Sequence, residues 1–97
     1  MSSSPVNIDL TDDHGHVNKD TVTIRRGMEI VWWSRGHGQA TIVFDSASGS
    51  PFASATFDLR DESVSSGPAI RGGSKQQFKY TVHGKNGVND PVVVVDP

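Results

Sequence analysis

The strongest constraint on this chain is a series of short β-branched and aromatic runs, which recur about every ten residues between turn-forming residues. Residues 6–10 and 21–25 alternate apolar with polar side chains, which is the period of a half-buried strand. No stretch keeps the period of an amphipathic helix. The pattern therefore predicts an all-β protein.

Further strands are predicted where apolar side chains cluster or alternate. Residues 75–82 have the clearest two-residue period, with Phe78, Tyr80 and Val82 on one face. Residues 92–95 form a continuous apolar run, as expected for a central or fully covered strand; at a sheet edge, this run would instead favour dimerisation. The remaining predicted strands are 29–34, 40–45, 56–59 and a short one at 68–70.

Length and composition fit one small domain. The chain has 97 residues, and its 10 Gly and 5 Pro suit a turn-rich β-protein. It contains no cysteine, which excludes disulfides, thiolate metal sites and thiol nucleophiles. We therefore expect a single domain over residues 1–97, folded as an antiparallel Greek-key β-sandwich or barrel of 7–8 strands.

Charge and hydropathy bear on partners and compartment. The net charge of −2 is spread in short groups and gives no basis for nucleic-acid or membrane binding. Residues 1–5 lack the basic and apolar regions of a signal peptide, and no apolar run approaches the ~18–20 residues that span a bilayer. We expect a soluble protein and favour the cytoplasm, although a chain trimmed of its signal peptide would look the same.

Two segments of the chain are similar to cupredoxins. Residues 27–32, a seven-residue gap and residues 40–45 resemble the cupredoxin glycine turn, a strand that ends in an aromatic residue, a loop, and a strand that opens with His-Asn. Gly73 followed by residues 78–82 resembles the strand that ends Tyr-x-Cys, and residues 90–95 resemble the closing strand. The resemblance spans roughly residues 22–96 and implies a cupredoxin-like fold.

The same resemblance implies that the blue-copper ligands are missing. A type 1 site needs two imidazoles, a thiolate and a weak axial thioether. The resemblance places the first His position on Ala40, the Cys on Val82 and the second His on or near Lys85. The only methionines, Met1 and Met28, lie outside the last loop. The resemblance thus implies neither type 1 copper nor electron transfer through it.

All four histidines fall in predicted loops or at a strand end. In a cupredoxin-like order the first, third and seventh connections share one end, and they hold His14 and His16, His37, and His83. Asp12, Asp13 and Asp90 accompany them. Neutral imidazole with carboxylate suits Zn²⁺, Ni²⁺ or Cu²⁺, so a site at His14, His16 and either His37 or His83 is one hypothesis. Solvated loop histidines and a pH-sensitive interaction surface are the others.

Adjacent tryptophans suggest a second exposed feature. Trp32 and Trp33 lie in one predicted strand, so their side chains point to opposite faces and one belongs to the core. The other, beside Arg35, would either anchor a partner or sugar ring or simply cover a sheet face. We predict an interaction surface made of Trp33, Arg35, His37 and His83.

Catalysis is not expected. The serine-rich segments 46–50 and 63–67 lack the strand-to-helix elbow that activates a serine, and residues 35–38 lack phosphate-loop spacing. Phe52, in the irregular segment 46–55, is predicted to cover one edge of the core.

The favoured function is a non-catalytic, cofactor-free binding module for a protein or small ligand, as a monomer or weak dimer. The alternative is a divalent-metal-binding protein that uses loop histidines. An immunoglobulin-like or fibronectin-like sandwich is the alternative fold, and it would scatter the histidines to both ends.

Overall fold

The computed structural model describes residues 5–60, 62–72 and 76–96. Within these residues the chain forms nine strands and no helix. Strand lengths run from two to eight residues. The strands are β1 (Val6–Asp9), β2 (Thr21–Arg25), β3 (Ile30–Trp33), β4 (Ala40–Phe44), β5 (Thr56–Leu59), β6 (Ser63–Ser65), β7 (Gln76–His83), β8 (Val88–Asn89) and β9 (Val92–Asp96).

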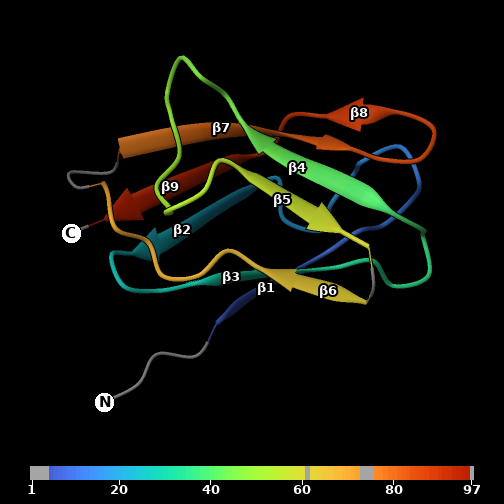
Figure 1. The fold of residues 1–97 in the computed structure, drawn as a ribbon, viewed down its shortest axis with the longest axis horizontal. Helices are drawn as coiled ribbons and strands as arrows, with labels where there is room; N and C mark the ends of the chain where they lie inside the picture. Colours follow the sequence, from blue (N-terminus) through green and yellow to red (C-terminus); the bar gives the residue numbers. More distant parts are fainter. Residues whose placement is uncertain (1–4, 61, 73–75, 97) are drawn as a thin grey trace.

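These strands form two facing sheets (Figure 1). The smaller sheet has the order β1-β3-β6, and the larger has the order β2-β9-β7-β4-β5, with β8 paired to β7. The pairs β1–β3 and β2–β9 are parallel, and the other pairs are antiparallel. The predicted all-β sandwich is confirmed.

In detail the sheets are mixed, where the sequence predicted purely antiparallel pairing. β1 and β2 flank a connection that is bridged at Leu10 and Val17, and the two strands join different sheets. β1 pairs in parallel with β3, and β2 pairs in parallel with β9. The sheets are open and do not close into a barrel, because β2 and β5 are the two ends of the larger order.

Strand bounds follow the sequence prediction where side chains alternate and depart from it where they do not. β2 and β5 have the predicted bounds. β6 and β8 were not predicted, since three mostly polar residues and a two-residue pair carry no period. Residues 68–70 form no strand, although Ala69 is buried and its amide donates to the Met28 carbonyl at 2.8 Å. The predicted strand start at 75 and the turn at Gly73 lie outside the described residues.

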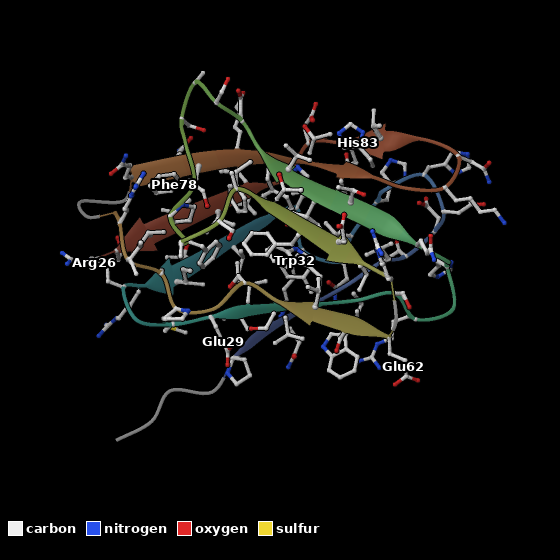
Figure 2. The ribbon with its side chains drawn as sticks, viewed as in Figure 1. Arg26, Glu29, Trp32, Glu62, Phe78 and His83 are labelled. Carbon is white, nitrogen blue, oxygen red and sulfur yellow. The ribbon has the colours of Figure 1, made fainter. Side chains whose placement is uncertain are left out.

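An aromatic cluster fills the space between the two sheets. Trp32 is 0% exposed and lies between the layers in Figure 2. Its ring centroid is 5.5 to 6.5 Å from those of four neighbours: Phe44, Phe52, Phe57 and Tyr80. Phe52 is 2% exposed, so the loop between β4 and β5 does insert this side chain into the core, as predicted.

β9 is a central strand, as its continuous apolar run predicted. It lies between β2 and β7, and Val93 and Val95 are buried while Val92 and Val94 are half-buried. Both of its edges are paired, so dimerisation through this strand is ruled out by its position. The described residues also contain no helix that is long and apolar enough to cross a membrane.

Candidate functional site: the loop rim

Three loops meet at one end of the sandwich because of strand direction. β1 and β3 are parallel and end together, while β7 runs antiparallel to β4 and ends where β4 begins. Residues 11–20, 34–39 and 84–90 therefore share the end on the right of Figure 1. We call these three segments the loop rim. His14, His16 and His37 lie in it, and His83 ends β7 beside it.

Main-chain contacts join the first and third segments of the rim. The Asn86 amide donates to the Asp13 carbonyl at 2.7 Å, and the Asn86 side-chain amide donates to Asp13 Oδ2 at 2.5 Å. Gly15 is buried with φ +84°, and a Cβ there would collide with the Val82 carbonyl. Gly84 lies equally close, since its Cβ would be 2.6 Å from the Gly15 nitrogen. The first and third segments of the rim are thus held together.

A shallow cavity of about 390 Å³ lies where the three segments meet. It carries two carboxylates, an imidazole and an ammonium group, so its lining has mixed charge. Two glycines of the second segment, Gly36 and Gly38, expose their backbone to it. The lining residues are Asp12, Asp13, Gly36, His37, Gly38 and Lys85.

Two of the four histidines are held by carboxylates through Nδ1. His16 Nδ1 lies 2.6 Å from Asp12 Oδ2, and His14 Nδ1 lies 3.0 Å from Asp13 Oδ1. Asp12 Oδ1 also accepts the amides of His14 and His16, at 2.8 and 3.2 Å. The hydrogen bond from His16 is the main reason that the pKa of Asp12 lies below its ordinary value. Both imidazole side chains remain more than half exposed, at 57% for His14 and 56% for His16.

The predicted metal ligands do not converge into one set. His37 lines the rim cavity, whereas His83 lines a separate hollow on the outer face of the larger sheet, with Thr81 and Asp90. In Figure 2 His83 points away from the core, near β8. Within the three described ranges, no three His, Cys, Asp or Glu side chains lie together as a metal-ion cage.

Trp33 lies half-buried on the outer face of the smaller sheet. Its Nε1–H donates to Asn7 Oδ1 at 2.9 Å, and the Arg35 guanidinium carbon is 4.6 Å from the ring centroid. Arg35 Nε donates in turn to Asp9 Oδ1 at 3.0 Å. The indole is therefore partly covered by Arg35, and a hollow of about 220 Å³ beside it reaches Glu62. The predicted interaction surface is split, because Trp33 and Arg35 line this hollow, whereas His37 lines the rim cavity and His83 lines the hollow on the larger sheet.

Sequence reasoning missed the residues that lock the rim. Neither the residue type nor the spacing in the sequence indicates a role for Gly15, Gly84 and Asn86. Their role comes from contacts between residues about 70 apart in the chain. The Asn-Gly pair at 86–87 was the available signal, since this dipeptide is typical of tight turns.

The positions that correspond to copper ligands do not fit a type 1 centre. Ala40 is 5% exposed and Val82 is 0% exposed, and both are part of the apolar core. Lys85 is exposed at the rim cavity, where its ammonium group repels a cation. A copper ion of this class requires a thiolate, and the chain has no cysteine.

No protein-family model and no curated protein sequence matches this chain. Solved structures of amicyanin do match, each with a TM-score of 0.65 over 99% of this chain and 86% of theirs. They are an oxidised Met-to-Lys variant, a Met-to-Ala variant with Cu(I), and a Pro-to-Gly variant in its reduced Cu(I) form, with 14%, 13% and 12% identity. At this identity the likeness concerns the fold. The chain therefore has a cupredoxin-like fold and lacks the type 1 copper ligands.

Proposed function

We propose that this protein is a non-catalytic binding module that works through the loop rim, without type 1 copper and without electron transfer. The observation that supports this is the cavity of about 390 Å³ at the junction of three separate loops. The hydrogen bonds between Asp13 and Asn86 hold two of these loops together before any ligand arrives, which lowers the entropic cost of binding.

The cavity favours a polar ligand of mixed charge. Asp12, Asp13, His37 and Lys85 offer both signs of charge within one hollow, and its volume is in the range of about 300–1,000 Å³ that holds small molecules. A small polar ligand or a charged side chain of a protein partner would satisfy these groups. An apolar ligand would leave them unpaired.

Quantitative capture from an extract of the source cells tests this function. The bait is the immobilised protein, compared with the double variant His37→Ala/Lys85→Ala, whose two side chains line the cavity. The matched control is Arg71→Ala/Lys79→Ala, since both side chains are exposed and outside the rim. We expect at least one molecule retained by the wild type and the control to be lost with the rim variant. Equal retention by all three baits would contradict the proposal.

The copper part of the proposal has its own test. With Cu²⁺ added, we expect no intense thiolate-to-copper absorption band, because the chain has no cysteine. Voltammetry of the same sample is expected to show no reversible protein-borne couple. A reversible couple that disappears on unfolding would contradict the absence of electron transfer.

Divalent-metal binding is the second candidate, and the two Asp–His pairs support it. Metal-binding histidines commonly engage a carboxylate through one ring nitrogen, which orients the other toward the metal. Asp12–His16 and Asp13–His14 have this arrangement. In a ¹H–¹⁵N titration with Zn²⁺ we expect saturable shifts in residues 11–20, lost in His14→Gln/His16→Gln but kept in His83→Gln. No response at several equivalents of metal would end this candidate.

A further inference from the structure

The first two strands each lie at a sheet edge, and the edge of β1 is capped. Asn18 closes it at Asp9, whose amide donates to Asn18 Oδ1 and whose carbonyl accepts the Asn18 amide, both at 2.9 Å. Lys19 Nζ donates to the Asn7 carbonyl at 3.1 Å. These caps occupy main-chain groups that a partner strand would need, so this edge is protected.

The edge of β2 is open by comparison. The Arg26 amide donates to the Asp96 carbonyl at 3.2 Å, and the Asp20 carbonyl accepts the Val92 amide at 2.8 Å, so even-numbered residues face β9. Because successive residues of a strand alternate, the N–H and C=O groups of Thr21 and Thr23 face the other way. In the part of the chain that the structure describes, no strand lies on that side of β2.

The turn after β2 ends the stretch of this edge whose main-chain groups face away from β9 without a partner among the described residues. The Arg25 amide donates to Met28 Sδ at 3.3 Å and its carbonyl accepts the Met28 amide at 3.0 Å. Among the described residues, the main-chain groups of β2 without a partner are therefore two N–H and two C=O, from Thr21 and Thr23. The side chains of both threonines are exposed on the outer face, whereas Val22 and Ile24 point into the core.

Cationic side chains stand at both ends of this open stretch. Lys19 precedes it and Arg25 and Arg26 end it; all three are exposed, and among the described residues none takes part in an ion pair. The nearby carboxylates are Asp20, which accepts from the Asn89 side chain at 3.4 Å, and Asp96, opposite Arg25 in β9. Arg26 extends outward in Figure 2, at the end opposite the rim.

This charge pattern argues against a second copy of the chain as the occupant. A two-fold pairing that satisfies all the free groups joins Thr21 of one copy to Thr23 of the other and is centred on Val22. That register sets Arg25 opposite Lys19 of the second copy. Like charges directly opposite each other destabilise a strand pair.

We propose that β2 is a docking edge at which an extended segment of a protein partner, with acidic residues at its two ends, adds to the larger sheet. Main-chain hydrogen bonds to Thr21 and Thr23 supply affinity, and the acidic ends meet Lys19 and Arg25. This surface follows β2 away from the rim cavity and shares only Lys19 with the loop rim, and Lys19 does not line that cavity, so the inference stands apart from the proposed function.

A peptide titration of the full ¹⁵N-labelled chain tests the docking edge. The probe is acetyl-Glu-Thr-Val-Thr-Val-Thr-Glu-amide, and its control has both Glu replaced by Lys. We expect the amides of Thr21 and Thr23 to shift and to exchange more slowly with solvent, while those of Val22 and Ile24, already bonded to β9, keep their protection. The Lys peptide is expected to bind at least about fivefold more weakly, from two exposed charge pairs.

Two variants separate docking from unfolding. Thr23→Pro removes an N–H that faces away from β9, which an edge strand tolerates, and is expected to abolish peptide binding. Thr23→Val keeps the main chain and is expected to bind as the wild type does. Unchanged amide shifts in β4 and β7 confirm that both variants fold.

Three results would overturn the inference. The first is that the acidic peptide leaves Thr21 and Thr23 unaffected. The second is equal binding of both peptides, which would show that the partner segment does not need acidic ends. The third is a concentration-dependent shift of Thr21 and Thr23 in the protein alone, which assigns the edge to a second copy.

Discussion

Asp12 combines three hydrogen bonds in one exposed turn. One oxygen accepts two amides and the other pairs with the His16 ring at 2.6 Å. This is an Asx-type turn with an added imidazole, and it orders the start of the first rim segment. The carboxylate form is the one that accepts all three bonds, so the turn depends on the ionisation of Asp12.

The pH dependence of this turn is predictable in sign. Because the pKa of Asp12 is lowered from 3.8 by the His16 hydrogen bond, the stabilisation is present above that value and is lost as pH falls through the folded-state pKa. Carboxyl-carbon NMR is expected to give a midpoint below 3.8, which moves upward in His16→Gln. In the control His14→Gln the backbone amide remains, so the midpoint should move less. Equal movement in both variants would contradict the assignment.

Tyr80 offers a second residue-scale prediction, because it is the only tyrosine. Burial raises its pKa to about 12 from 10.0, while the Trp32 Nε1–H that donates to its hydroxyl at 3.4 Å acts the other way. The unfolded chain therefore ionises first, and stability falls by roughly 2–3 kcal/mol as pH rises from about 10 to 12. Urea unfolding across that range, with phenolate absorbance, measures both. A phenolate midpoint near 10 in the folded protein would refute this.

At the scale of loops and strands, Gly15 links the first rim segment to β7. Its φ of +84° and the collision that a Cβ would make with the Val82 carbonyl both require glycine. Gly36 has a nearly equal φ of +82° but open space around it. Substitutions at the two glycines therefore separate the cost of backbone strain from the cost of a steric clash.

We expect Gly15→Ala to destabilise the protein by more than Gly36→Ala, which should cost about 1 kcal/mol from its backbone conformation alone. Gly15→Ala adds a main-chain clash to the same strain, for a total of about 2–4 kcal/mol. Chemical denaturation of both variants measures the difference. Equal losses would show that the Gly15 contact is not tight.

Element prediction from the sequence succeeded where the alternation was strong. The period in residues 21–25 and 75–82 predicted which side chains face the core, because a two-residue period leaves one choice of face, and Val22, Ile24, Phe78, Tyr80 and Val82 are indeed buried. It failed for β6 and β8, because these strands have only three and two residues and exist through their pairing with β3 and β7. It also failed for the lock between Asp13 and Asn86, which depends on the approach of two loops that no local pattern encodes.

For the whole molecule, one core serves both sheets. Trp32 comes from the smaller sheet and packs on Phe44, Phe57 and Tyr80 from the larger. Strand order explains why the site could be foreseen only in outline: the shared end of the histidine loops followed from a cupredoxin-like order, but the separate direction of His83 did not.

We expect unfolding to be a single cooperative transition, which also tests the single-domain expectation for residues 1–97. Tryptophan fluorescence reports the smaller sheet, and amide signals of Val93 and Val95 report the larger. Because both share the core, their denaturant midpoints should coincide. Separate midpoints would indicate two independently folding parts. The control Trp33→Phe isolates the emission of the buried Trp32.

The direction of the outermost strands has a practical consequence for presenting this protein. β1 starts and β9 ends at the end of the sandwich opposite the rim, on the left of Figure 1. A tether attached before β1 or after β9 therefore points the three rim loops away from the attachment point. Either attachment displays the same rim loops outward, as on a sensor chip, a bead or the tip of a fused scaffold.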